Sequence, residues 1–308
     1  MARRRKGVAI HGWLNIDKPA GVTSNDVVTR VRRATNAAKV GHGGTLDPMA
    51  TGVLPIALGE ATKTVSYAMD GTKTYLFTVR WGVATATDDA EGAVTETSGG
   101  RPEAAAIEAA LGQFTGEIEQ VPPVYSAIKV DGRRAYDLAR NEEAVELKPR
   151  RVRIDALRLV GCPDTDTAEF EMTSGKGVYV RALARDLAQA LGTLGHVARL
   201  RRTAVAGFTE KGAISLDNLE TLGHIAPASS ILMPIETVLD DIPALALTVQ
   251  EANRLRHGQG VPVLPVASRS PFKDIVQGDT VVAMAEGRLV ALAKIAGGEI
   301  RPVRVINL

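Results

Sequence analysis

Residues 41 to 55 read Gly-His-Gly-Gly-Thr-Leu-Asp-Pro-Met-Ala-Thr-Gly-Val-Leu-Pro, a composition that predicts a rigid turn around Asp47. The glycines before Asp47 admit backbone angles with φ > 0 and the close approach of a ligand. Pro48 follows directly and moves the backbone of the aspartate away from the α region. A glycine-rich turn with a helix-capping aspartate has the same composition and is the more common case. The segment alone therefore makes Asp47 a candidate catalytic carboxylate, with a structural role as the alternative.

A second candidate is the segment Lys176-Gly-Val-Tyr-Val-Arg181, which leads into a predicted amphipathic helix. The apolar stripe of this helix consists of Val180, Leu183, Leu187 and Leu191. That stripe places Arg181 off the buried face and in the first turn, where a cation opposes the helix dipole. The position indicates another duty for Arg181, such as pairing with a carboxylate, and a solvated surface arginine is the alternative. Arg185 and Asp186 have the pattern of ordinary surface charges.

Basic residues are clustered, although the formal net charge of the chain is only +2. The clusters are residues 148–153 and residues 199–202, with Arg133 and Arg134 nearby in the sequence. Such clustering fits contacts to phosphates and salt-sensitive binding of nucleic acid. Solvated strand and loop faces are the alternative. The acidic group at residues 88–91 is predicted to be a solvated turn.

Composition and motifs exclude several classes of protein. Hydrophobic residues make up 45% of the 308 residues and charged residues 23%, which is typical of a soluble globular protein. The single cysteine, Cys162, suits a reducing compartment, and no apolar run approaches the roughly 18 residues of a membrane span. Metal-binding, phosphate-loop, dinucleotide and Gly-x-Ser-x-Gly motifs are missing. We therefore expect a cytoplasmic enzyme that uses carboxylate, tyrosine and arginine, without metal or cofactor.

Apolar periodicity predicts an α+β fold. Strands are expected at residues 13–16, 73–83 and 168–173, and helices after Thr23 or Ser24, after Pro102 and from residue 180. They are interspersed without a regular βαβ period, which favours α+β over a doubly wound sheet.

Three segments of different character follow one another along the chain. Residues 1–8 are expected to be a disordered basic leader, and residues 9–240 one large domain. An interruption near residues 238–247 precedes a small β-rich module at residues 245–308. The single short helix of this module begins with a capping box at Thr248-Val-Gln-Glu251.

Taken together, these segments closely resemble the TruB family of bacterial tRNA pseudouridine synthases. The matching stretches are residues 17–24, 41–63, 121–129 with Gly132 and Tyr136, 176–186, and 195–202. They occur in the order of the family and span most of residues 12–210, and residues 245–308 resemble its C-terminal module more loosely. The chain departs from the family at Gly43, at Ser174-Gly175 and at Val178, none of which has a chemical role.

The resemblance implies a fold and a function. It implies a catalytic domain at residues 9–240, built on a mainly antiparallel mixed sheet with flanking helices and loops. This domain would include an RNA-gripping insertion at about residues 120–150, and residues 245–308 would form a PUA-like RNA-binding module. The implied activity is isomerisation of uridine 55 in the TΨC loop of tRNA, by a monomer without cofactor or metal.

The family's functional residues carry over to positions in this chain. Asp47 matches the catalytic aspartate, Tyr75 the tyrosine that stacks on the target base and is implicated in proton transfer, and Arg181 the arginine paired with the aspartate. Residues matching those that line the pocket of the flipped nucleotide are His42, Tyr179 and Leu200. Further substrate-binding positions implied by the matching stretches are Lys18, Lys176 and Arg202.

The chemistry of the reaction agrees with these roles. A carboxylate can attack or stabilise C1′ while the glycosidic bond breaks, and a bonded arginine favours its charged form. The base must leave its stack before C1′ can be reached, and an aromatic face can receive it. Two alternatives are a related synthase that acts on another RNA, and a non-catalytic RNA-binding or chaperone protein in which Asp47 is incidental. The joint presence of Asp47, Tyr75 and Arg181 disfavours the second.

Overall fold

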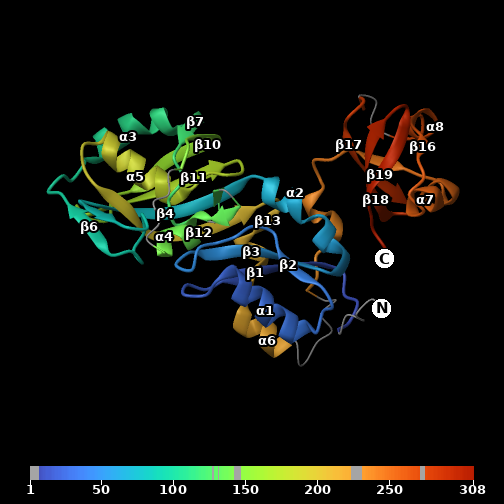
Figure 1. Ribbon diagram of the computed structural model, residues 1–308, viewed down its shortest axis with the longest axis horizontal. Helices are drawn as coiled ribbons and strands as arrows, with labels where there is room; N and C mark the ends of the chain where they lie inside the picture. Colours follow the sequence, from blue (N-terminus) through green and yellow to red (C-terminus); the bar gives the residue numbers. More distant parts are fainter. Residues whose placement is uncertain (1–6, 127, 131, 142–146, 223–230, 271–274) are drawn as a thin grey trace.

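The main body of the molecule is a ten-stranded mixed sheet with the order β14-β1-β3-β12-β4-β11-β10-β7, in which β2 and β13 pair with β3 and β12 (Figure 1). The computed structural model describes residues 7–126, 128–130, 132–141, 147–222, 231–270 and 275–308. The strands are β1 Gly12–Lys18, β2 Val40–His42, β3 Thr51–Leu58, β4 Lys73–Trp81, β7 Gly116–Gln120, β10 Arg150–Gly161, β11 Thr167–Ser174, β12 Gly195–Val205, β13 Phe208–Thr209 and β14 Ile214–Ser215. Within the described part of this sheet, only β1–β14 and β3–β12 run parallel. The predicted α+β class with a mainly antiparallel mixed sheet is confirmed.

Helices cover the sheet and complete its core. They are α1 Ser24–Thr35, α2 Val65–Asp70, α3 Ala104–Leu111, α4 Ala135–Arg140, α5 Val180–Ala190 and α6 Leu216–Leu222. Strand β4 shows why the core forms: Phe77 and Trp81 are buried while Leu76 is partly exposed, as the alternation predicts. Phe77 stacks on Phe170 of β11 with 5.2 Å between ring centroids. Leu183 of α5 belongs to the same apolar cluster, so the first turn of α5 is anchored on the sheet.

Helix α1 begins with a capping box. Thr23 accepts a hydrogen bond from the Asp26 backbone N–H through its hydroxyl, and the Asp26 carboxylate accepts one from the Thr23 N–H, each at 3.1 Å. Of the two caps that the sequence allows, Thr23 is therefore the one used. Ser24 becomes the first helical residue, and its side chain is buried.

The C-terminal part of the chain forms a separate five-stranded sheet with the order β15-β17-β18-β19-β16, coloured orange and red in Figure 1. Its elements are β15 Ala244–Ala246, α7 Val249–Arg256, β16 Val261–Pro262, α8 Val263–Ala267, β17 Thr280–Ala285, β18 Arg288–Ala296 and β19 Glu299–Val305. The capping box of Thr248 and Glu251 opens α7 as predicted. The module is not loosely attached, because Val282 and Leu292 share an apolar cluster with Trp13 of β1. The exact domain limits stay a prediction.

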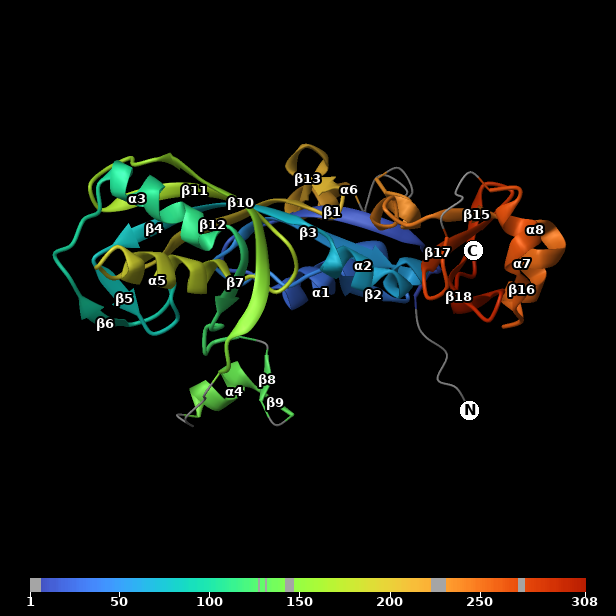
Figure 2. The same ribbon diagram turned by 90° about the horizontal axis from the view of Figure 1, so that it is seen from above.

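A small segment projects from the main body between β7 and β10 (Figure 2). It contains the hairpin of β8 Lys129–Val130 and β9 Arg133–Arg134, followed by α4. It falls within the insertion expected at residues 120–150, and its grip on RNA stays a prediction. The hairpin of β5 Val83–Thr85 and β6 Val94–Thr97 lies at the opposite end of the body from the C-terminal module (Figure 1).

The N-terminal leader expected at residues 1–8 falls largely outside the described residues. Val8 is an exception, since it donates to the Asn36 carbonyl at 2.7 Å and accepts from the Ala38 N–H at 2.9 Å. The expectation of disorder is therefore wrong for Val8. Along the described part of the chain, no helix is long and apolar enough to cross a membrane.

Candidate active site

Asp47 lies in the turn between β2 and β3, at the edge of a cavity of about 660 Å³. The cavity is lined by Thr23, Ser24, Asn25, His42, Thr45, Leu46, Asp47, Pro48, Thr87, Asp89, Glu91, Tyr125, Ser126, Tyr136 and Arg181. The Asp47 side chain is 33% exposed and is part of the lining of this cavity. These residues come from the start of α1, the Asp47 turn, the β5–β6 loop, the base of the projecting segment and α5. Distant parts of the sequence thus converge on one carboxylate.

Gly43 and Gly44 are each required in the turn, but for different structural reasons. Gly44 has a φ of +134°, a backbone conformation that favours glycine. Gly43 instead meets close neighbours, because a Cβ there would lie 3.0 Å from the Ala68 side chain and 3.2 Å from Trp13. The departure from the family at Gly43 therefore accompanies tight packing of this loop on the body.

Arg181 is the partner of Asp47. Its Nε lies 2.8 Å from Asp47 Oδ2, and its other guanidinium nitrogens donate to the carbonyls of Thr87 and Tyr125, each at 3.0 Å. The predicted carboxylate partner of Arg181 is thus confirmed. The expectation that Arg181 lies off the buried face is wrong, since its side chain is only 5% exposed. Two loops cover the first turn of α5 and enclose the guanidinium.

Asp89 is the residue that the sequence interpretation missed. It was expected in a solvated turn, yet it is 3% exposed, and its Oδ2 lies 3.6 Å from Arg181 Nε. The β5–β6 loop is drawn inward because Ala90 donates to the Val197 carbonyl of β12 at 3.0 Å. The acidic run at residues 88–91 was the available signal, but only the fold shows which of its members is buried.

Burial dominates the electrostatics of the site. It raises the pKa of Asp47 above its usual range, and the Asp89 charge raises it further, whereas Arg181 and Lys18 oppose the shift. One guanidinium therefore serves two carboxylates. Arg181 offsets only part of the effect of burial on Asp47. The carboxylate beside the open cavity therefore keeps a raised affinity for protons.

Lys18 and Arg202 support the backbone around Asp47. The Lys18 ammonium is fully buried and donates to the Pro48 carbonyl at 3.0 Å, as well as to Pro19 and Val22. Burial lowers the pKa of Lys18 to about 8, partly offset by Asp47 and Glu91. Arg202 is 1% exposed and donates to the carbonyls of Gly44 and Val53. Both cations are used within the protein, and their expected contact with substrate stays a prediction.

The remaining basic residues of that cluster differ from one another. Arg201 forms two hydrogen bonds of 3.0 Å with the Asp17 carboxylate, while Arg199 is exposed. Residues 199–202 are therefore not the uniform phosphate-binding surface that the sequence indicates, because one arginine is buried and another is neutralised. On β10, Arg150, Arg151 and Arg153 are exposed as expected.

His42 and Tyr179 lie around the same carboxylate. His42 lines the cavity, and its Nδ1 is buried without a hydrogen-bond partner among the described residues. Burial lowers the pKa of His42, which favours the neutral imidazole at pH 7. Tyr179 immediately precedes α5, where Gln120 anchors its backbone in both directions, at 2.9 and 3.1 Å. Burial raises the pKa of the Tyr179 phenol.

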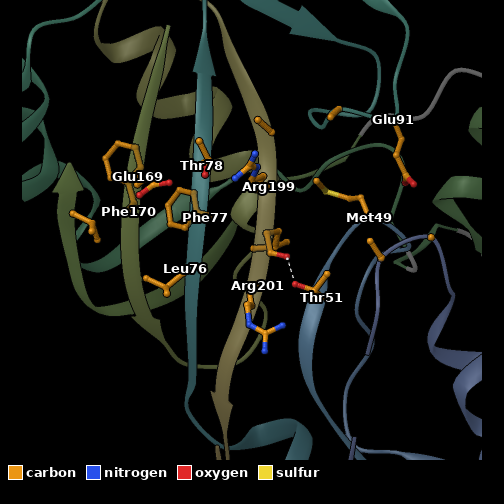
Figure 3. Close-up of a pocket in the computed structure, with 16 residues that line it drawn as sticks. Met49, Thr51, Leu76, Phe77, Thr78, Glu91, Glu169, Phe170, Arg199 and Arg201 are labelled. Atoms are coloured by element: carbon orange, nitrogen blue, oxygen red, sulfur yellow. Dashed lines mark hydrogen bonds between the residues drawn. The ribbon is translucent and has the colours of Figure 1, made fainter. Parts of the chain in front are cut away.

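A second cavity of about 620 Å³ is lined by Thr51, Phe77 and Arg201, among others (Figure 3). Leu200 belongs to the same lining. The Thr51 hydroxyl donates to the Leu200 carbonyl at 3.4 Å, and Met49 lines the same cavity. Glu91 lines both cavities, so the two adjoin at this residue.

The last two expected site residues, Tyr75 and Lys176, are not among those that line these cavities. Tyr75 lies in β4, paired with Arg202 of β12, and is not among the described side chains that line either cavity. Lys176 is exposed and forms an ion pair of 3.1 Å with Asp70. The structure therefore brings Asp47, Arg181 and His42 together, and roles for Tyr75 and Lys176 stay predictions.

Across the described ranges, no group of three or more His, Cys, Asp or Glu side chains could hold a metal ion.

Comparison with known proteins agrees with this geometry. Residues 32–180 match the model of the TruB family pseudouridylate synthase N-terminal domain, and residues 181–240 match that of the tRNA pseudouridylate synthase B C-terminal domain. The proteins named tRNA pseudouridine synthase B of Rhodospirillum rubrum and Caulobacter vibrioides are 62% and 55% identical to the chain, each over the whole length of both chains.

Among solved structures, the chain is similar to one from a Cbf5-Nop10-Gar1 complex, with a TM-score of 0.77 and 26% identity. That alignment covers 96% of this chain and 85% of the other. A second, from an archaeal box H/ACA sRNP Nop10-Cbf5 complex, has a TM-score of 0.73 at 24% identity over 100% and 93% of the two chains, and it supports the fold alone. With two family models and full-length relatives in agreement, the chain belongs to the TruB family of pseudouridylate synthases.

Proposed function

We propose that the chain isomerises uridine 55 in the TΨC loop of tRNA to pseudouridine. The observation that carries the proposal is the Asp47–Arg181 pair, a buried cation that holds a partly exposed carboxylate at the edge of an open cavity. Full-length relatives that are 50 to 62% identical are named tRNA pseudouridine synthase B, which supports tRNA as the substrate.

The reaction needs no co-reactant. The N1–C1′ bond of the uridine breaks, the uracil turns, and a C5–C1′ bond forms, after which the proton on C5 is lost and N1 carries a proton. Asp47 assists at C1′, either by attack or by stabilising an elimination. The electrons balance within the nucleotide, so neither an oxidant nor a nucleotide cofactor is consumed.

The surrounding residues have complementary roles in this proposal. Arg181 keeps Asp47 ionised, Tyr75 receives the displaced base on its ring and takes part in proton transfer, and a neutral His42 contacts the RNA where the nucleotide leaves its stack. Further contacts to the nucleotide and its neighbours come from Tyr179, Leu200, Lys18, Lys176 and Arg202.

The wider RNA is held by parts outside the cavity. Residues 9–240 form the catalytic domain, and the segment at residues 120–150 grips the RNA beside the exposed arginines at the start of β10. Residues 245–308 act as a PUA-like RNA-binding module. The enzyme works in the cytoplasm as a monomer, without cofactor or metal.

The test is chemical mapping of pseudouridine in an unmodified tRNA transcript after incubation with the purified protein, without added cofactor or metal. Pseudouridine at position 55 is the expected result. Modification of another RNA, with position 55 untouched, would favour the related synthase. Binding of tRNA without any isomerisation would favour a non-catalytic RNA-binding or chaperone protein.

A further inference from the structure

Ser24 lies at the start of α1 and contacts the turn that carries Asp47. A serine at the beginning of a helix usually serves as its cap, but here Thr23 and Asp26 already form the capping box. The Ser24 hydroxyl is therefore free for another contact. It reaches Leu46, which directly precedes Asp47 in the chain.

Two hydrogen bonds join Ser24 to Leu46. The Ser24 hydroxyl accepts from the Leu46 N–H at 2.9 Å and donates to the Leu46 carbonyl at 3.0 Å. That carbonyl belongs to the peptide bond between Leu46 and Asp47. Ser24 is 3% exposed and Leu46 is 4% exposed, so water does not replace these bonds readily. One side chain thus fixes the peptide unit from which Asp47 extends.

The other side of Asp47 is held by the same stretch of chain. The Pro48 carbonyl accepts from the Gly21 N–H at 2.9 Å and from the Lys18 ammonium at 3.0 Å. Residues 18–24 therefore support the turn on both sides of the carboxylate. Among the described residues, Ser24 is the only side chain that hydrogen-bonds the backbone of Leu46.

We infer that Ser24 is a positioning residue for isomerisation, one that holds the Leu46–Asp47 peptide so that the carboxylate meets both Arg181 and C1′. This inference rests on the proposed function. The Asp47–Arg181 contact of 2.8 Å requires that the turn hold Asp47 in its present position. Arg181 is itself held by two backbone carbonyls and cannot follow a displaced carboxylate. A shift of about 1 Å at a reacting group costs on the order of 100-fold in rate.

The experiment compares Ser24→Ala with Asp26→Ala in the full chain. Asp26→Ala breaks the capping box of the same helix from an exposed position, so it weakens α1 without touching the Asp47 turn. Single-turnover rates at saturating enzyme, affinity for unmodified tRNA and thermal melting are measured for both variants. Ser24→Ala is expected to slow isomerisation at least about tenfold with little change in tRNA affinity. Asp26→Ala is expected to keep the wild-type rate.

The pH dependence of the single-turnover rate is a second readout, which a change in the stability of α1 alone would not shift. Arg181 lowers the pKa of Asp47, so a displaced carboxylate loses this help and its pKa rises. The acidic limb of the Ser24→Ala rate should therefore lie at higher pH than that of the wild type. Ser24→Thr, which keeps the hydroxyl, should recover part of the rate. Should the alanine variant not fold, Ser24→Cys, whose thiol is a weak donor, gives the same comparison.

The outcomes distinguish a failure of the proposed function from a failure of the positioning role of Ser24. A wild-type protein that makes no pseudouridine in tRNA contradicts the proposed function. An active wild type with Ser24→Ala equal to it in rate and pH profile overturns the positioning role alone. The positioning role is also overturned if both variants lose rate in proportion to the drop in their melting temperatures.

Discussion

Arg181 Nε and Asp47 Oδ2 lie 2.8 Å apart, with the arginine side chain 5% exposed and the aspartate side chain 33% exposed. The asymmetry matters for function. The cation is enclosed by backbone carbonyls and cannot move with the substrate, whereas the carboxylate keeps one side open to the cavity. Such preorganisation costs nothing at the moment of reaction, because the charges are already oriented.

Arg181→Lys should lower the single-turnover rate by about 100-fold or more, since an ammonium cannot reproduce the planar fork that reaches Asp47, Thr87 and Tyr125. Arg158→Lys on β10, whose side chain is 61% exposed and paired with Glu171 at 2.9 Å, is the matched control and should stay near the wild-type rate. A near-wild-type rate for Arg181→Lys would show that the pairing has no catalytic importance.

Asp89→Asn should move the acidic limb of the rate to lower pH. The Asp89 charge raises the pKa of Asp47, so its removal lets Asp47 lose its proton at lower pH. The rate itself should fall, since Asp89 also helps to hold Arg181 at 3.6 Å. A pH–rate profile under single-turnover conditions measures both effects. A limb that stays in place or moves to higher pH would speak against this electrostatic account.

Asp47→Asn should leave the fold intact and become relatively more stable as pH rises. A carboxyl whose folded pKa is raised favours the folded state at low pH, and this contribution is lost as pH rises through the folded pKa. The melting temperature of the variant, compared with that of the wild type, should therefore increase from acidic to neutral pH. The opposite trend across that range would mean that Arg181 outweighs burial at this site.

Removal of residues 245–308 should weaken tRNA affinity more than it slows the chemical step, as expected for an RNA-binding module. The structure adds a cost in stability, because Val282 and Leu292 cover Trp13 and Phe208 of the main body. A fully buried side chain of this kind contributes about 1.5–3 kcal/mol. The truncated chain should melt at lower temperature but keep its single-turnover rate at saturating enzyme. A rate loss as large as the affinity loss would contradict the modular division.

Local patterns predicted much of the architecture. The alternation in β4, the capping box of Thr248 and Glu251 and the α+β class follow from residue periodicity and side-chain chemistry, which act over short distances. The segment around Arg181 leaves both carboxylate pairing and a solvated arginine open, and the observed contact with Asp47 decides between them. The resemblance to a family then indicated which carboxylate it is.

Burial of charged residues could not be predicted in the same way. Arg202 belongs to a basic cluster that is typical of phosphate contacts, and the resemblance implies substrate binding by Lys18, yet both side chains are buried and bind backbone carbonyls near Asp47. Asp89 belongs to an acidic run that is typical of a solvated turn, yet it is buried beside Arg181. In each case the decisive contact joins segments far apart in the chain, and it depends on how β12 and its neighbouring loops pack. No local pattern records that arrangement.

The most direct test of the central claim compares wild type and Asp47→Asn on unmodified tRNA, with pseudouridine mapped at position 55 and binding measured in parallel. Complete conversion by the wild type, and binding without conversion by Asp47→Asn, are the expected results. Conversion by the variant at a rate close to that of the wild type would contradict the assignment of Asp47 as the catalytic carboxylate.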